Sequence, residues 1–312
     1  FPCSPHHKDG ARQNDVLKNF TIRIFVLDLY IRDYSMNVCI TGGAGFIGSH
    51  TVSACLKAGH TVSVIDNLSH GFKDNIPSGV SFYNADIRDV TVLEKVKKEQ
   101  NPEALIHLAA QISVPDSLKK PEETFAINTE ATKLLLDILK PQKVVFASSG
   151  GAIYGDPEVI PTPEDSPLMP TSPYGESKKR AEVILNEYFH ANKQAAVTLL
   201  RYANVYGPHQ PHDGGGVVAI ICKALKDDEE FILNGDGNQT RDFVYVEDIV
   251  KANLKALDQS AQYEIFNIGT GGETQLNNVI KMLQGVSRKA LTITQEKTQD
   301  EVVRSVLNSD KA

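Results

Sequence analysis

From residue 37 onward, short apolar runs alternate with longer stretches in which apolar residues recur at helical spacing. The runs are rich in valine and isoleucine and too short for helices, which is typical of strands buried on both faces. Strands separated by amphipathic segments indicate βαβ units and a parallel sheet. Strands are expected at residues 37–41, 61–66, 80–86, 104–110 and 143–149, and helices at 46–59, 90–100 and 123–140. The pattern predicts a doubly wound α/β fold.

The alternation of strand-like and helix-like segments becomes irregular after residue 207. We expect residues 1–35, of which the first 15 are polar and rich in helix breakers, to form an extension outside the fold. Residues 36–201 are then the main domain. Residues 202–312 form a second, smaller α/β substrate lobe over the carboxyl edge of the sheet, where ligands of this architecture bind. We expect this lobe to be truncated at its C-terminal end.

Composition narrows the class of protein. Of the 312 residues, 41% are hydrophobic and 23% are charged, as in ordinary folded proteins, and the net charge of −7 argues against nucleic-acid binding. The apolar segment 22–31 is interrupted by Arg23 and Asp28 and is far shorter than the ~20 residues of a membrane span. We therefore expect a cytoplasmic protein without membrane contact.

Metal binding is not expected. The four cysteines lack the spacing of metal ligands, so reduced, buried thiols are the preferred interpretation. His209, His212 and Asp213 resemble a ligand cluster, but the loop that carries them offers no fourth ligand.

The stretch "TGGAGFIGSH", residues 41–50, places three glycines where the first strand gives way to a helix. Gly42, Gly45 and Gly48 permit a tight turn, a close approach of backbone N–H groups to a pyrophosphate, and close packing of helix on sheet. Asp66 ends the second strand, 18 residues after Gly48, where a carboxylate accepts hydrogen bonds from an adenosine ribose and favours NAD over NADP. Asp86 is placed to meet the adenine, or alternatively to cap a helix.

A second constellation carries candidate chemistry. Tyr174 and Lys178, in "SPYGESK", are neighbours on one helical face. An ammonium near a phenol favours the phenolate, so we expect Lys178 to lower the pKa of Tyr174 and make it a base. Ser148 and Ser149 end the strand 143–149, where a hydroxyl can share a proton with Tyr174. The alternative interpretations are a solvated helix face and capping serines.

Together with "DNLSHG", "HLAAQISVPDS" and "LRYANVYGP", these motifs resemble the extended short-chain dehydrogenase/reductase family of NAD-dependent epimerases and dehydratases over about residues 36–312. The resemblance implies a Rossmann-like NAD domain, a homodimer and a UDP-sugar substrate. It implies Ser149, Tyr174 and Lys178 as the catalytic residues, with Ser149 preferred to Ser148 by counting forward from the strand. The NAD contacts that it implies are Gly42, Gly45, Phe46, Ile47, Gly48, Asp66, Asn67, Asp86, Ile87, Leu108, Ala109, Ala110, Asn128, Tyr174, Lys178 and Tyr202.

The resemblance also places Ser149, Asn204 and Arg241 at the sugar nucleotide, and Lys297 or Arg304 at a phosphate position where relatives carry an arginine. Its implied reaction is 4-epimerisation of a UDP-hexose through a transient 4-keto sugar. Ser305 stands where some relatives narrow the sugar pocket with tyrosine, so acceptance of N-acetylated sugars is expected as well. Another nucleotide-sugar epimerase or decarboxylase, and an NAD-binding regulator without chemistry, remain alternatives.

Overall fold

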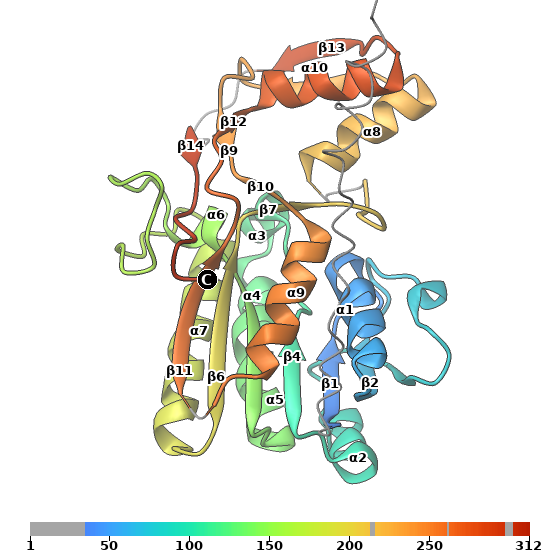
Figure 1. Ribbon diagram of the computed structural model, residues 1–312, viewed down its shortest axis with the longest axis vertical. Coiled ribbons are helices and arrows are strands. Elements are labelled where there is room, and N and C mark those ends of the chain that lie inside the picture. The colour runs from blue at the N-terminus through green and yellow to red at the C-terminus, as the bar shows by residue number, and fades with distance from the viewer. Residues whose placement is uncertain (1–34, 213–215, 261, 297–301) are drawn as a thin grey trace, which may run out of the picture. The chain divides into compact units, whose positions relative to one another are not determined.

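The computed structural model describes residues 35–212, 216–260, 262–296 and 302–312. Residues 35–312 form one compact unit, and the extension predicted for residues 1–35 lies almost wholly outside the described residues. The unit is built on a seven-stranded sheet in the order β11-β6-β5-β4-β1-β2-β3, in which every neighbouring pair is parallel (Figure 1). The predicted doubly wound α/β class is confirmed.

The main layer contains the strands and helices predicted for residues 37–149 and further elements from later in the chain. The strands are β1 (Asn37–Thr41), β2 (Thr61–Asp66), β3 (Ser81–Asn84), β4 (Ala104–His107), β5 (Lys143–Ser149), β6 (Ala196–Tyr202) and β11 (Tyr263–Ile268). The helices are α1 (Phe46–Lys57), α2 (Val90–Gln100), α3 (Val114–Lys119), α4 (Pro121–Phe125), α5 (Ala131–Leu139), α6 (Gly150–Ile153), α7 (Pro173–Ala191) and α9 (Val246–Leu257), with a 3₁₀ turn at Lys73–Asn75 and a π-helical turn at Ala126–Glu130.

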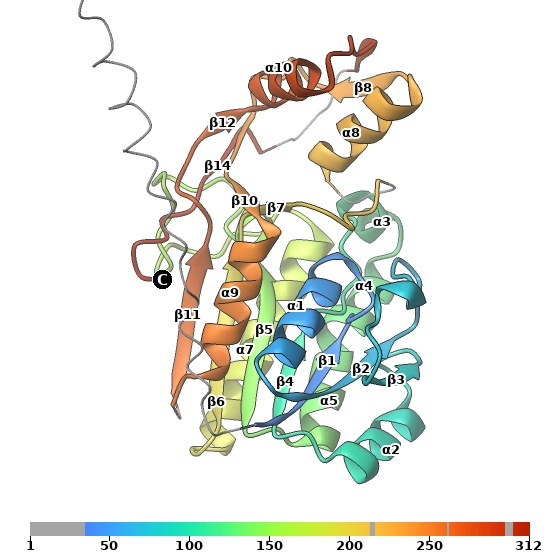
Figure 2. The same ribbon diagram turned by 45° about the vertical axis from the view of Figure 1, so that its right-hand side comes forward.

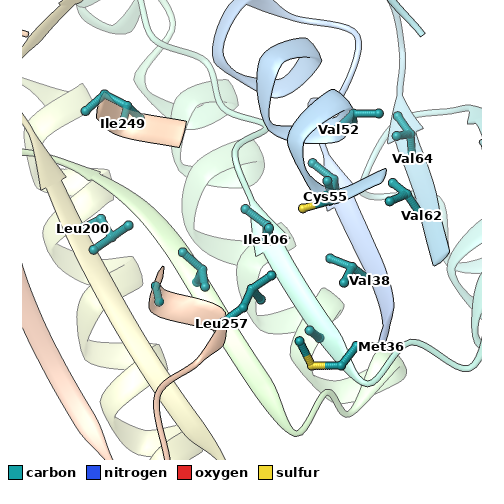
Figure 3. Packing of buried hydrophobic residues seen from close by; sticks show 14 of the residues in the cluster. Met36, Val38, Val52, Cys55, Val62, Val64, Ile106, Leu200, Ile249 and Leu257 are labelled. Carbon is teal, nitrogen blue, oxygen red and sulfur yellow. The ribbon is translucent and has the colours of Figure 1, made fainter. Parts of the chain in front are cut away.

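Successive side chains of each central strand point to opposite faces of the sheet, and both faces are covered. On β1, Val38 and Ile40 belong to the core beneath α1 and α9, whereas Cys39 belongs to the core beneath α2, α5 and α7. Figure 3 shows the first core, where Val52 of α1 and Leu257 of α9 pack over the strands. Such two-sided burial explains why the strand sequences read as continuous apolar runs.

A smaller lobe lies beyond the carboxyl ends of the central strands (Figures 1 and 2). It has its own core, formed by α8, β8 and α10. Its elements are α8 (Val217–Asp227), β8 (Phe231–Asn234) paired with β13 (Ile293–Glu296), α10 (Leu276–Ser287), β9 (Thr240–Arg241) between β12 (Thr274–Gln275) and β14 (Arg304–Ser305), and β7 (Asn204–Tyr206) beside β10 (Phe243–Tyr245). Parallel-sheet proteins bind ligands at this edge.

The division expected at residue 201 differs from the structure. β11 joins the main sheet beside β6, and α9 packs against α1. The reason is the apolar face of these elements, since Ile249, Leu257 and Ile268 are buried in the main core. The chain therefore enters the smaller lobe, returns to the sheet and leaves it again.

Two of the cysteines match the predicted buried thiols. Burial raises the pKa of Cys39 and Cys55 to about 12, so both are protonated and inert at neutral pH. Cys222 is free but exposed, which contradicts the prediction of burial, and Cys3 lies outside the described residues. In the described part of the chain, no helix has the length and apolar character needed to span a membrane.

Candidate active site

The glycine turn between β1 and α1 is sterically closed to larger residues. Gly42 has a φ of +71°, and a Cβ there would lie 2.8 Å from the backbone nitrogen of Ala109. A Cβ at Gly48 would lie 2.0 Å from the carbonyl oxygen of Gly42. The first turn of α1 therefore lies directly on the turn that follows β1. Its free N–H groups and helix dipole favour a negatively charged group at this position.

A cavity of about 770 Å³ opens beside this turn, along the carboxyl ends of β1, β2, β4 and β5. All of the predicted NAD contacts except Asn128 line it. These are Gly42, Gly45, Phe46, Ile47, Gly48, Asp66, Asn67, Asp86, Ile87, Leu108, Ala109, Ala110, Tyr174, Lys178 and Tyr202. The cavity is within the size range of cofactor sites and mixes apolar walls with a few polar groups, so the residues present fit a dinucleotide.

Asn128 lies one layer behind the cavity. Its side chain accepts a hydrogen bond from the Gln111 N–H at 2.8 Å, donates to the Gln111 carbonyl at 2.9 Å and donates to the Ser177 hydroxyl at 3.0 Å. These bonds hold the segment after β4 against helix α7. Asn128 is thus placed to support the cavity wall, and its predicted contact with NAD stays a prediction.

The carboxylate of Asp66 joins the glycine turn to the loop after β2. One oxygen accepts a hydrogen bond from the Ala44 N–H at 2.9 Å and the other from the Leu68 N–H at 2.8 Å. A carboxylate offers about four acceptor positions, so the predicted bond to a ribose remains available.

Asp86 does not cap helix α2, because Asp89 accepts the N-terminal N–H groups of that helix. Asp86 instead pairs with Arg88, with Nη2 and Oδ2 2.7 Å apart. The Arg88 hydrogen bond holds the pKa of this carboxyl below its usual value. The helix-cap interpretation is therefore wrong, and a contact with adenine stays a prediction.

The predicted catalytic residues meet where β5 ends against the first turns of α7. Ser172 caps this helix by accepting a hydrogen bond from the Gly175 N–H, which fixes the start of the helix and the position of Tyr174. The Tyr174 hydroxyl is hydrogen-bonded to Ser149. The Lys178 ammonium donates to the Ala147 carbonyl at 2.8 Å and lies 4.7 Å from the centre of the Phe146 ring.

One expectation about this trio is wrong in the structure. Burial raises the pKa of Tyr174, and the hydrogen bond with Ser149 only partly opposes that rise. Burial also lowers the pKa of Lys178 to about 8, against a favourable charge from Glu182. A buried ammonium needs a hydrogen-bond acceptor. Lys178 finds it in the Ala147 carbonyl of β5, so helical spacing alone does not direct it onto the phenol.

The two candidate serines, Ser148 and Ser149, differ in the residues with which their hydroxyl groups interact. The Ser148 hydroxyl donates to Glu182 at 2.6 Å and is buried, whereas Ser149 bonds to Tyr174. Ser148 does border the cavity and Ser149 is not among the residues that line it. Proton sharing depends on the partner of each hydroxyl rather than on the area it contributes to the cavity wall. This arrangement supports Ser149 for the proton-sharing position.

The residues expected at the sugar nucleotide and its sugar pocket lie on four segments of the chain, at the end of β5 and in β7, β9 and β14. A Cβ at Gly151, two residues after Ser149, would lie 3.7 Å from the Ser305 hydroxyl and 3.8 Å from the Asn204 amide oxygen. Arg241 is the strand partner of Ser305 in the pairing of β9 with β14. These four positions therefore gather at one place beyond the end of β5.

Arg304 is held by another residue. Its guanidinium makes a bidentate pair with Glu273, with distances of 2.6 and 2.8 Å. Hydrogen bonds from Arg304 and Thr240 lower the pKa of Glu273 to about 2, so the pair stays charged. Contact of Arg304 with a substrate phosphate stays a prediction, and Lys297 lies outside the described residues.

The suspected histidine cluster does not assemble in the described part of the chain. His209 stacks on His50, with ring centroids 5.1 Å apart, Asp213 lies outside the described residues, and no group of three potential ligands occurs among the residues described.

Sequence reasoning missed a buried polar network behind the catalytic helix. Glu182 pairs with Arg201, and both side chains are nearly inaccessible to solvent. Arg201 also donates to the Tyr154 hydroxyl at 2.8 Å, and Tyr154 donates to Asn267 at 2.8 Å. One signal pointed to it: Glu182 follows Lys178 by four residues, as Lys178 follows Tyr174, so all three share one face of α7.

Comparison with known proteins agrees with this geometry. Residues 38–269 match the model of the NAD dependent epimerase/dehydratase family, and the chain belongs to that family. A crystal structure of UDP-glucose 4-epimerase from Thermotoga maritima with UDP-glucose is similar, with a TM-score of 0.84, 40% identity, and coverage of 88% of this chain and 91% of that one.

Two further solved structures are similar. The UDP-glucose 4-epimerase of Thermus thermophilus in complex with NAD has a TM-score of 0.84 and 38% identity, and the alignment covers 88% of this chain and 91% of that one. A UDP-N-acetylglucosamine 4-epimerase from Methanobrevibacter ruminantium, in complex with UDP-N-acetylmuramic acid, has a TM-score of 0.82 and 31% identity, and the alignment covers 89% and 90% of the two chains.

Proposed function

We propose that the protein is an NAD-dependent 4-epimerase of UDP-hexoses that interconverts UDP-glucose and UDP-galactose. The observation that carries the proposal is that Tyr174 and Lys178 line the same cavity as the glycine turn, with the Lys178 ammonium bonded to the Ala147 carbonyl near the end of β5. The effect of Ser149 on the pKa of Tyr174 agrees with this arrangement. The likeness to two UDP-glucose 4-epimerases at 38–40% identity supports the choice of substrate.

Each residue of the trio has a distinct task in this proposal. When bound, NAD would supply the acceptor for the hydride of sugar carbon 4 and the donor for its return. Tyr174 accepts the proton of the 4-hydroxyl and later gives it back, while Ser149 orients that oxygen. Because burial raises the pKa of the Tyr174 phenol above its usual value in the protein alone, its activation depends on the Ser149 hydrogen bond, which lowers that pKa. The Lys178 ammonium would hold the nicotinamide ribose.

Other segments of the chain hold the two nucleotides in place while the sugar turns. The N-terminus of α1 and its glycines would hold the NAD pyrophosphate, and Asp66 would hold the adenosine ribose. Asn204 and Arg241 would bind the sugar nucleotide, since a guanidinium suits a diphosphate.

Dehydration, the other reaction in the description of this family, requires a group that does not follow Ser149 in this chain. Related dehydratases and decarboxylases place acidic residues directly after the serine or threonine, whereas here Ser149 is followed by Gly150 and Gly151. No carboxylate is therefore positioned there as the acid or base of an elimination. A regulator without chemistry does not require the Ser149, Tyr174 and Lys178 arrangement.

Turnover without added cofactor tests the proposal. The purified protein is incubated with UDP-galactose, the product is separated chromatographically, and the denatured protein is assayed for released NAD. We expect UDP-glucose to form, and NAD to be recovered from the protein. A protein that retains NAD and converts neither sugar would instead support the regulator.

We propose that N-acetylated UDP-sugars are accepted as well, because Ser305 presents only a small hydroxyl beside Gly151. Replacing Ser305 by tyrosine is expected to lower turnover of UDP-N-acetylglucosamine at least about tenfold, a difference of roughly 1.4 kcal/mol, and to preserve turnover of UDP-glucose. The matched Ser305→Ala variant is expected to retain both. Absence of turnover of the acetylated sugar by the unaltered protein would contradict the proposal.

We also propose that the protein is a cytoplasmic homodimer that pairs through helices on the flank of the sheet. Val183 on α7 is apolar and 53% exposed, so a partner helix on that flank would cover it. The mass of the purified protein in solution tests the pairing, and a monomer mass at micromolar concentration would contradict it.

A further inference from the structure

We infer that Glu182 is a positioning residue of the active site that, with Arg201, fixes helix α7 against the ends of β5 and β6 and keeps Lys178 charged. The inference deepens the proposed function, on which its activity readout rests. The geometry comes from contacts of α7 with the two strands, none of which involves substrate or cofactor.

The first observation is a ladder of contacts from one face of α7 to three consecutive residues of β5. Tyr174 bonds to Ser149, the Lys178 ammonium donates to the Ala147 carbonyl at 2.8 Å, and Glu182 accepts from the Ser148 hydroxyl at 2.6 Å. A shift of α7 along its axis would break all three contacts. The ladder thus sets where Tyr174 and Lys178 stand relative to the end of the strand.

The second observation is the strength of the anchor at the Glu182 end. Arg201 of β6 donates to the two Glu182 oxygens at 3.0 and 2.7 Å, and the side chains are only 3% and 6% exposed. Bidentate pairing fixes both distance and orientation. Arg201 also donates to the Tyr154 hydroxyl and the Glu164 carbonyl. These bonds fix the orientation of the guanidinium that binds Glu182.

The third observation is electrostatic. Lys178 is 3% exposed, and burial favours its neutral form, while the negative charge of Glu182 on the same helix favours the ammonium. The other titratable or charged groups around Lys178 are Tyr174 on its own helix, His107 on β4 and, behind Glu182, Arg201 on β6.

Of these groups only Lys178 titrates between about pH 7 and pH 9. Burial, with a smaller contribution from the Lys178 charge, lowers the pKa of His107 to about 3, and burial raises that of Tyr174. The guanidinium of Arg201 stays charged. A change in behaviour over that range therefore reports on Lys178.

Removing the Glu182 charge is expected to shift the pH at which kcat declines on the alkaline side of its pH profile to a lower value. The proposed function needs the Lys178 ammonium, so kcat should fall as pH rises through about 8, the pKa of this lysine. In Glu182→Gln this decline should move about one pH unit lower, the scale of shift that a neighbouring opposite charge produces. KM for the UDP-sugar should stay unchanged, because the Glu182 side chain bonds to Ser148 and Arg201 and to neither Asn204 nor Arg241. Glu176→Gln, which breaks an exposed ion pair on the same helix, is the matched control and should leave the profile in place.

A second readout does not require turnover. A double-mutant cycle of Glu182→Gln and Lys178→Met, measured as free energy of unfolding, isolates their coupling. Lys178 binds a proton more weakly in the folded than in the unfolded protein, so its charge penalises folding below about pH 8, and this penalty disappears as pH rises towards 10.5. Glu182 reduces that penalty. The coupling should therefore favour folding near pH 7 and shrink near pH 10.

The outcomes separate the inference from the proposed function. If Glu182→Gln does not fold, the cycle is run in the Arg201→Met background, which removes the unpaired guanidinium. The role of Glu182 is overturned if the Glu182–Lys178 coupling free energy is equal at pH 7 and pH 10. It is also overturned if Glu182→Gln is active and its kcat declines at the same alkaline pH as in the unaltered protein. An inactive unaltered protein with pH-dependent coupling overturns the proposed function and leaves the positioning of Lys178 standing.

Discussion

Tyr174→Phe is expected to lower epimerase turnover by about 10²–10⁴-fold, the usual contribution of a positioned acid or base. The variant removes one oxygen from a half-buried ring on α7 and leaves the cavity lining otherwise intact. NAD should therefore remain bound. The measurement is kcat for UDP-galactose together with the amount of NAD released on denaturation.

Tyr188→Phe is the matched control for this variant. Tyr188 stands on the same helix, but its hydroxyl donates to the Pro141 carbonyl at 2.8 Å, at the opposite end of α7 from Ser149. Its loss should cost about 1 kcal/mol of stability and leave turnover unchanged. Wild-type turnover by Tyr174→Phe would remove the phenol from the proposed chemistry.

Gly48→Ala is expected to abolish NAD retention and to lower the free energy of unfolding by about 1–3 kcal/mol, the cost of forcing a methyl group into a packed site. The added Cβ would lie 2.0 Å from the Gly42 carbonyl oxygen, so helix and turn must separate. That movement displaces the N–H groups that the proposal assigns to the pyrophosphate. Thermal unfolding and the NAD content of the purified variant are measured.

Gly285→Ala provides the control for this substitution. Gly285 lies in helix α10, and a Cβ there meets nothing within 4 Å. Alanine is favoured over glycine in a helix by about 1 kcal/mol, so this variant should be slightly more stable and should keep its NAD. Full NAD content in Gly48→Ala would show that the cofactor does not depend on the glycine turn.

Much of the fold follows from local pattern, because two-sided burial leaves apolar runs that are visible in the sequence. The runs at residues 37–41 and 61–66 became β1 and β2 with the predicted bounds. The return of α9 and β11 to the main sheet was not predicted. It depends on long-range packing of Ile249 and Ile268 in the main core, which the spacing of residues along the sequence does not reveal.

The site divides in the same way. Spacing placed Tyr174 and Lys178 on one helical face, and counting placed Ser149 beside the phenol. Spacing did not reveal that Lys178 bonds to the Ala147 carbonyl, nor that burial outweighs charge at the phenol. Those outcomes depend on desolvation and on acceptors from another element, and only the folded arrangement determines them.

The most direct test of the central claim follows the hydrogen on carbon 4 of the sugar. UDP-galactose labelled with deuterium at that carbon is converted by the purified protein in ordinary water, and the product is analysed by mass spectrometry. The account predicts UDP-glucose that keeps the deuterium at carbon 4, because the same hydrogen leaves and returns within one closed site. Product that has exchanged its deuterium for solvent hydrogen would contradict the account.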